Sequence, residues 1–280
     1  MTPSEAVVIR AQMVEGMAKA KYIPDTPWQT KAGGQMELKA IASADLFTWR
    51  QDLVSAALQA SASLPSPVTL RPDLMPAPNG LFLLAQPIRV QPVESAVFAI
   101  GWGSVFDDYV GIWLYGETRG RNHTGLGPLT AHRSMIVKHG CELSVDDRSA
   151  DWRRFKTDDS LRDVAQASVR FLVSAWLWLK QTVVRSQKES GNRASRKIAS
   201  RIPVHSEVNV IQLRRVERNP SGHAESSVEY SCQWLVRGHW RQQWYPATTT
   251  HRPIWIEPHL KGPDDKPLKI PTENVFAVNR

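Results

Sequence analysis

The chain has 280 residues, of which 42% are hydrophobic and 22% are charged, which is typical of a soluble globular protein with a sizeable core. The sequence has no apolar run long enough for a membrane span and no continuous signal-peptide core, so we expect a cytoplasmic protein without membrane contact. The two cysteines, Cys141 and Cys232, are too few for a disulfide framework and lack metal-site spacing. We therefore expect no metal and no cofactor.

The net charge of +8 is unevenly placed along the chain. The segment from Lys180 to Gly262 contains 14 Lys and Arg against 6 Asp and Glu, so it accounts for the whole excess. Such an asymmetry favours an anionic partner, most commonly nucleic acid. The alternative is that the basic charge serves only solubility.

Residues 1–64 predict an N-terminal helical segment. Its first helix begins after Ser4 with Glu5 in the first turn. Its second covers 44–64, where apolar residues recur at near-helical spacing. We treat 1–64 as a candidate surface for a protein partner and 65–280 as an α+β domain, with one continuous domain over 1–280 as the alternative.

The middle of the chain predicts strands and one long helix. Prolines between 65 and 95 favour short edge strands or a segment that covers a sheet edge. AVFAIGWGSV and YVGIWLYGETR predict an antiparallel hairpin, whose glycines indicate a bulge or a tight approach rather than a phosphate-binding loop. Residues 159–184 carry a wide apolar stripe, which predicts a buried helix. The expected fold is α+β, a mostly antiparallel sheet packed on a long central buried helix, with N-terminal helices.

Residues 185–201 are rich in basic and poor in apolar side chains, which indicates either a solvated linker or a flexible arm that binds phosphates. VHSEVNVIQLRR then predicts a strand, and SSVEYSCQWLVRGHWRQQW predicts a second long strand antiparallel to it.

The stretch 234–268 combines four tryptophans, three histidines, three arginines and two lysines. Alternation along a strand places His239 and Arg241 on one face and Trp240 on the other. Folding back through the following loop would bring Tyr245, His251 and Arg252 near His239 and Arg241; this register is a hypothesis.

Three functions fit this pattern. The first is nucleic-acid binding by phosphate contacts and base stacking, without chemistry. Its candidate residues are Arg193, Arg196, Lys197, Arg201, Arg237, Trp244, Arg252 and Lys261. The second is metal-independent RNA cleavage, which needs an acid, a base and a cation for the phosphorane. Its candidate catalytic residues are His239, Arg241, Tyr245 and His251. The third is a structural or protein-interaction role.

The motif GHWRQQWYP followed by HRPIWIEPHLKGPDDKPL resembles the C-terminal region of an uncharacterised family of actinobacterial and mobile-element proteins. The family pattern is GHWRxQWYP…HRxIWIxPxxKGPxDxPL, and this chain departs from it mainly at Ala247, Thr248 and Thr249. The likeness extends over about the last 110 residues, through AWLWLKQ, NRASRKIASR and VNVIQLRR. It implies a plasmid, phage or defence setting, including toxin–antitoxin systems, and no particular mechanism. RNA or single-stranded DNA is the expected nucleic acid.

Overall fold

The computed structural model describes residues 1–19, 31–65, 68–69, 72–89, 96–106, 108–117, 128–138, 142–143, 159–181, 184–202, 204–213, 231, 234–236, 238–256, 259–261 and 263. Its contacts divide the chain into a larger unit, Met1–Arg214, and a smaller unit, Arg215–Arg280. Each unit is described by itself below.

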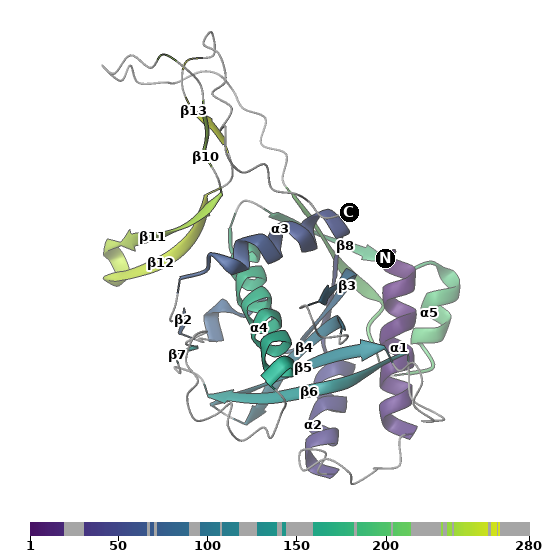
Figure 1. The fold of residues 1–280 in the computed structure, drawn as a ribbon. Helices are drawn as coiled ribbons and strands as arrows, with labels where there is room; N and C mark the ends of the chain where they lie inside the picture. The colour runs from purple at the N-terminus through teal and green to yellow at the C-terminus, as the bar shows by residue number, and fades with distance from the viewer. Residues whose placement is uncertain are drawn as a thin grey trace. The chain divides into compact units, whose positions relative to one another are not determined.

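The larger unit contains both helices and strands (Figure 1). Its helices are α1 (Pro3–Lys19), α2 (Lys31–Ala42), α3 (Gln51–Ala62), η1 (Pro72–Leu74), α4 (Asp159–Leu179) and α5 (Arg193–Ala199). Its strands are β1 (Asp45–Trp49), β2 (Val68–Thr69), β3 (Gly80–Arg89), β4 (Ala96–Phe106), β5 (Tyr109–Glu117), β6 (Leu129–Lys138), β7 (Glu142–Leu143), β8 (Val184–Ser190) and β9 (Glu207–Leu213).

Seven of the described strands form one sheet in the order β6-β5-β4-β3-β1-β9-β8. Strand β1 runs parallel to β3 and β9. The remaining neighbours pair antiparallel. The parallel step from β1 to β3 needs a crossover, and α3 lies within it. The expected α+β class is therefore confirmed, and the sheet within it is mixed.

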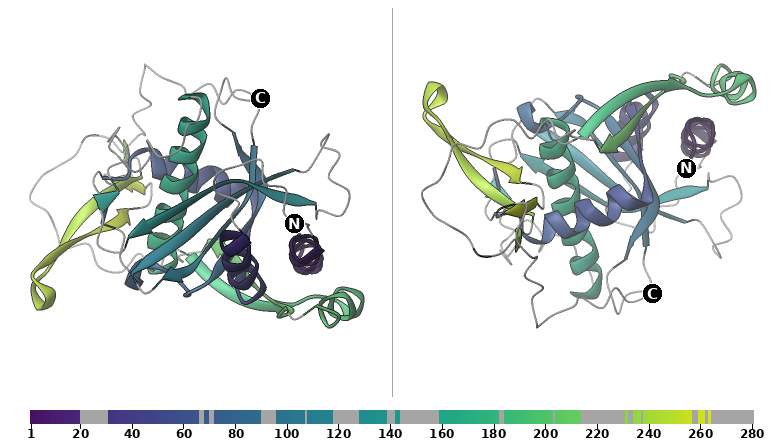
Figure 2. Two further views of the ribbon diagram at one scale, coloured as in Figure 1. Left: turned by 90° about the horizontal axis from the view of Figure 1, so that it is seen from below. Right: turned by 90° about the horizontal axis from the view of Figure 1, so that it is seen from above.

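Helices cover the sheet on both sides, with α1 and α2 on one face and α3 and α4 on the other (Figure 2). Side chains alternate between these faces along β3. Leu81 and Leu83 belong to the core cluster that includes residues of α1 and α2, whereas Phe82 contacts the rings of Trp49 and Trp102. This double covering explains why β3 is buried from Gly80 to Leu84.

Aromatic rings fill the space between the sheet and α4. Trp102 of β4 lies 5.4 Å from Trp176 of α4, and Trp49 of β1 lies 5.7 Å from Phe171, measured between ring centroids. Both contacts are edge-on, a favourable geometry for aromatic pairs. The members of this aromatic layer are Phe47, Trp49, Phe82, Trp102, Phe171 and Trp176.

Arg170 ties α4 to the end of α3. Its guanidinium donates hydrogen bonds to the backbone carbonyls of Ser61, Ala62 and Leu64, at 2.9, 3.1 and 3.1 Å. The last carbonyls of a helix have no partner within the helix, and a cation there also complements the helix dipole. This polar residue thus fixes how the two helices meet on their face of the sheet.

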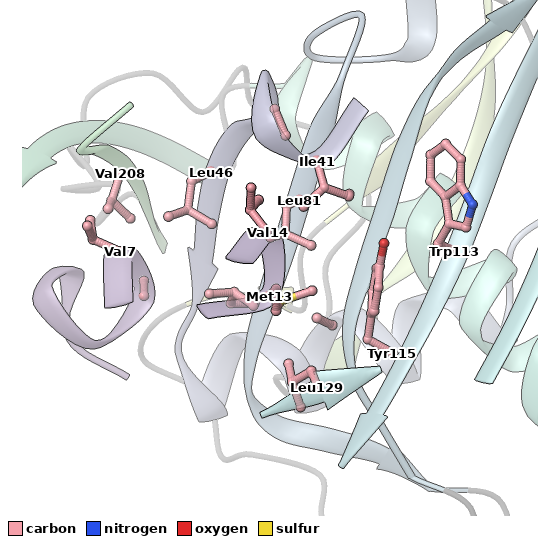
Figure 3. Packing of buried hydrophobic residues seen from close by; sticks show 14 of the residues in the cluster. Val7, Met13, Val14, Ile41, Leu46, Leu81, Trp113, Tyr115, Leu129 and Val208 are labelled. Atoms are coloured by element: carbon pink, nitrogen blue, oxygen red, sulfur yellow. The ribbon is translucent and has the colours of Figure 1, made fainter. Parts of the chain in front are cut away.

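On the opposite face, glycine lets α2 approach the sheet closely. A Cβ atom placed on Gly101 of β4 would lie 2.5 Å from Cδ1 of Ile41 and 3.1 Å from the ring of Tyr115. Figure 3 shows Ile41 and Tyr115 among the apolar side chains of this cluster, with Val14 of α1 and Leu81 of β3. The predicted tight approach at the glycines of β4 is confirmed.

Other predicted elements are confirmed as well. A helix occupies Pro3–Lys19 where one was expected after Ser4. The hairpin of β4 and β5 and the helix α4 also form as expected, although α4 ends at Leu179 and β8 begins at Val184. Strand β9 forms within VHSEVNVIQLRR.

The prediction of one helix over 44–64 was wrong. Residues Asp45–Trp49 form β1, and the helix begins only at Gln51. Four consecutive residues from Leu46 to Trp49 are buried because both faces of this strand are covered. Such a short apolar run has no alternation that would distinguish it from a buried helix.

The assignment of the proline-rich region to edge strands was also wrong for β3, which lies between β1 and β4. Its register with β4 shifts between Leu83 and Ile88, and Pro87 falls within this irregularity. A proline lacks the N–H needed for a regular ladder, so the irregular segment accommodates it without displacing the strand to an edge.

The smaller unit contains strands β10 (Trp234–Val236), β11 (His239–Tyr245), β12 (Thr250–Ile256) and β13 (His259–Lys261), with η3 (Pro246–Thr248) before β12. β10 pairs with β13, and β11 pairs with β12. SSVEYSCQWLVRGHWRQQW was expected to form a single strand antiparallel to β9. Its described residues instead form β10 and β11, whose partners β13 and β12 lie further along the chain.

No described helix is long and apolar enough to cross a membrane.

Candidate nucleic-acid interface

Basic residues on α5 form the first candidate surface. Arg193, Arg196 and Lys197 of this helix are exposed, as is Arg201 just after it, whereas Ser195 and Ala199 are buried. This pattern follows from helical periodicity, because residues three and four positions apart share a side of the helix. We call Arg193, Arg196, Lys197 and Arg201 the α5 basic face.

Local hydrogen bonds hold α5 in place. The side chain of Asn192 caps the helix by accepting from the backbone N–H of Ser195 at 2.9 Å. The backbone N–H of Asn192 donates to Oγ of Ser4 in α1, also at 2.9 Å. Gly191 is packed closely as well, because a Cβ there would lie 2.3 Å from Oγ of Ser195.

The prediction of a linker or flexible arm over 185–201 was therefore wrong. Residues Val184–Ser190 form β8 at the edge of the sheet, and α5 follows on a fixed base. Arg185 and Lys188 of β8 are exposed, and Lys188 lies 3.4 Å from the carboxylate of Glu207. The basic charge of this segment is thus displayed on ordered elements.

The second candidate surface is the hairpin of β11 and β12 (Figure 1). Its register pairs Trp240 with Trp255 and Trp244 with His251. Directly paired residues point to the same face of a hairpin, and successive pairs alternate between faces. One face therefore contains Trp240, Trp244, His251 and Trp255, and we call it the aromatic face. The other face contains His239, Arg241, Tyr245 and Arg252, and we call it the cationic face.

Ring contacts run along the aromatic face. Trp240 and Trp255 meet edge-on with 5.4 Å between centroids, and Trp244 lies 4.9 Å from the imidazole of His251. Trp240 is only 9% exposed, whereas Trp244, beside the turn, is 44% exposed. The indole at the tip therefore presents much of its surface to solvent.

On the cationic face, an arginine lies against an exposed phenol. The Arg252 guanidinium carbon is 5.5 Å from the centroid of the Tyr245 ring, within the range of a cation–π contact. Tyr245 is 38% exposed, and Arg241 and His239 are exposed further along β11. Guanidinium groups match phosphate geometry through paired hydrogen bonds, so this face suits phosphate binding.

The structure separates the two histidines that were predicted to form an acid–base pair. His239 pairs with Ile256, whereas His251 pairs with Trp244, five positions further along β11. At about 3.4 Å per residue this spacing is about 17 Å, and the two side chains also point to opposite faces. Tyr245 and Arg252 contact each other on the cationic face, whereas their predicted approach to His239 and Arg241 stays a prediction. Arg237 and the side chain of Lys261 lie outside the described part of the chain.

Sequence reasoning missed a polar pair in the larger unit that joins the buried Tyr115 to the partly buried Glu37. The hydroxyl of Tyr115 in β5 donates to Oε1 of Glu37 in α2 at 2.9 Å. Desolvation raises the pKa of Glu37 to about 7, and the Tyr115 hydrogen bond opposes part of this rise. Nothing in the local sequence signals the pair, because the two residues are 78 positions apart.

A groove of about 550 Å³ lies between α1 and α5, and Ala85 of β3 also lines it. Val8 and Ile9 line it from α1, and Ala194 and Ile198 line it from α5. For metals, no three His, Cys, Asp or Glu side chains gather anywhere among the residues that the structure describes.

No protein-family model matches the chain, and no curated protein matches it. Among solved structures, the crystal structure of AcrVA2 aligns over 91% of this chain and 93% of that chain. The alignment has 12% sequence identity and a TM-score of 0.40. At these values it assigns neither a family nor a function to this protein.

Proposed function

We propose that this protein binds nucleic acid, RNA or single-stranded DNA, in the setting of a plasmid, phage or defence-type system. The proposal includes no catalysis and no cofactor. The setting rests on the resemblance of the C-terminal motif, and the binding rests on the two candidate surfaces.

The α5 basic face is the observation that carries the proposal. Three exposed cations lie on α5 and a fourth, Arg201, follows directly after it. The helix is capped by Asn192 and tied to α1 through Ser4. Ordering a flexible arm on a polyanion costs conformational entropy, and a fixed helix avoids that cost. The exposed arginines of the hairpin add a further phosphate-binding surface of the same charge.

Metal-independent RNA cleavage is the less favoured alternative. It needs an acid and a base within reach of one scissile phosphate. His239 and His251 occupy opposite faces of the hairpin and are separated by five register positions. A structural or protein-interaction role remains the alternative that involves no nucleic acid.

The first test is a gel-shift assay with end-labelled single-stranded and duplex RNA and DNA, in low salt with EDTA. We expect retarded and intact single-stranded probes. Shortened RNA would instead favour the ribonuclease, and unshifted, intact probes would favour the structural or protein-interaction role.

The second test replaces Arg193, Arg196, Lys197 and Arg201 together by Gln. We expect weaker binding and a log–log salt dependence whose slope is smaller by roughly 3, because each single-strand phosphate contact contributes about 0.7. The matched control replaces four exposed cations elsewhere: Lys39, Arg89, Lys138 and Lys180. Equal effects of the two sets would mean that net charge alone, and not the α5 basic face, is responsible.

A further inference from the structure

The tip of the β11–β12 hairpin places two exposed rings on opposite faces of one ladder. Trp244 and Tyr245 are neighbours in sequence, so their side chains point in opposite directions, and they are 44% and 38% exposed. The turn Pro246–Thr248 follows directly, so both rings lie where the ladder ends.

Each ring has a polar or cationic neighbour from β12. His251 lies 4.9 Å from Trp244 on the aromatic face, and Arg252 lies 5.5 Å from Tyr245 on the cationic face. We expect these contacts to narrow the range of rotamers that both aromatic side chains adopt before a ligand binds. A pre-positioned ring loses less entropy when a ligand stacks on it.

Exposed aromatic rings beside arginines favour unpaired bases over a duplex. Single-stranded nucleic acid can stack its bases on aromatic side chains while arginines contact its backbone. The bases of a duplex are stacked on one another and paired, so their flat surfaces are not accessible to Trp244. Phosphate contacts alone would bind both forms and would not discriminate between them.

We infer that the hairpin tip is a single-strand-selective site, in which an unpaired base stacks on the indole of Trp244. Arg252, on the opposite face of the ladder beside Tyr245, contacts a phosphate further along the same strand. This inference rests on the proposed function and deepens it, because it names the form of nucleic acid and the residue that selects it. The α5 basic face supplies charge, and the hairpin tip supplies selectivity.

The test measures fluorescence anisotropy with a labelled single-stranded RNA and with the matching duplex, for wild type and for Trp244→Leu. We expect tighter binding of the single strand by wild type. Trp244→Leu should weaken single-strand binding roughly tenfold, as expected for the loss of one stacked base, and leave duplex binding unchanged. Trp244→Phe, which keeps an aromatic ring at this position, should retain most of the affinity for the single strand.

Gln242→Ala is the matched control, because Gln242 is exposed on the same face and has no ring. It should bind both probes like wild type. Equal affinity of wild type for the two forms, or a change below twofold in Trp244→Leu, would overturn the inference and leave the proposed function intact. No binding of either probe at low salt would overturn both.

Discussion

Tryptophan is enclosed in the larger unit and exposed at the hairpin tip of the smaller unit. In the larger unit Trp49, Trp102 and Trp176 are fully buried between the sheet and α4. On the hairpin of the smaller unit Trp244 is 44% exposed. A sheet covered by helices offers enclosed space for large rings, whereas the end of a two-stranded ladder offers only a surface. The same residue type therefore serves packing in the larger unit and is an exposed ring at the hairpin tip.

The largest effect on the unfolding free energy should come from Trp102→Ala, which tests the packing role of tryptophan in the larger unit. Trp102 contacts Phe82 and Trp176, and its indole N–H donates to the carbonyl of Ala77 at 3.0 Å. Removing a buried aromatic side chain typically costs about 3–5 kcal/mol of unfolding free energy. We expect a loss of that size in urea unfolding followed by circular dichroism.

Trp244→Ala is the matched variant on the hairpin, and its unfolding free energy should stay within about 0.5 kcal/mol of wild type, as is usual at exposed sites. A loss comparable with that of Trp102→Ala would contradict the comparison and assign Trp244 a packing role.

A smaller, pH-dependent effect is expected inside the larger unit. The pKa of Glu37 is raised from 4.5 to about 7 by desolvation, so the folded protein holds this proton more tightly than the unfolded chain. The resulting stabilisation is fully present below about pH 4.5 and is lost as the pH rises to about 7. Glu37→Gln cannot ionise, so its stability relative to wild type should increase across this range.

Urea unfolding of both proteins between pH 4.5 and 8 measures the difference. Tyr115→Phe should shift the pKa of Glu37 upward, because the Tyr115 hydroxyl lowers this pKa in the wild type. Its removal should move the pH-dependent loss to higher pH. A constant difference between wild type and Glu37→Gln at every pH would show that Glu37 titrates normally.

The smallest effect concerns the hairpin turn. Thr249 has φ of 47° and ψ of 39°, the left-handed region that β-branched residues rarely occupy. Its N–H still donates to the carbonyl of Pro246 at 3.2 Å. Thr249→Asn should stabilise the hairpin by about 1 kcal/mol, because Asn tolerates this conformation better.

Hydrogen exchange of the β11 and β12 amides is the suitable measurement, since it reports local opening of the hairpin. Thr248→Asn is the neighbouring control and should change exchange less. Faster exchange in Thr249→Asn than in wild type would show that the left-handed residue does not limit the stability of this turn.

Several elements could be predicted because their signals are local. The apolar stripe of α4 and the β-branched and aromatic runs of β4 and β5 have periods that one element alone determines. The candidate cations could likewise be found by counting charges along the chain. Their exposure on α5 could not, because it depends on the burial of Ser195 and Ala199 in the fold.

The elements that were wrongly predicted depend on neighbours that are remote in sequence. β1 has no alternation because both its faces are covered, and β3 lies at the centre of the sheet despite Pro87. The pairing of Tyr115 with Glu37 joins α2 to β5 across 78 positions. Patterns along the chain cannot report such contacts, since they form only when the sheet and its two helical layers assemble.

The sequence by itself determined the α+β class, the helices α1 and α4, and the place where basic and aromatic residues concentrate. Only the tertiary structure decided the order of the strands, the fixed position of α5 and the face to which each hairpin side chain points. The hairpin shows the physical reason. A strand has a period of two, so the register set by the turn determines which residues share a face. That register placed Tyr245 beside Arg252 and separated His239 from His251.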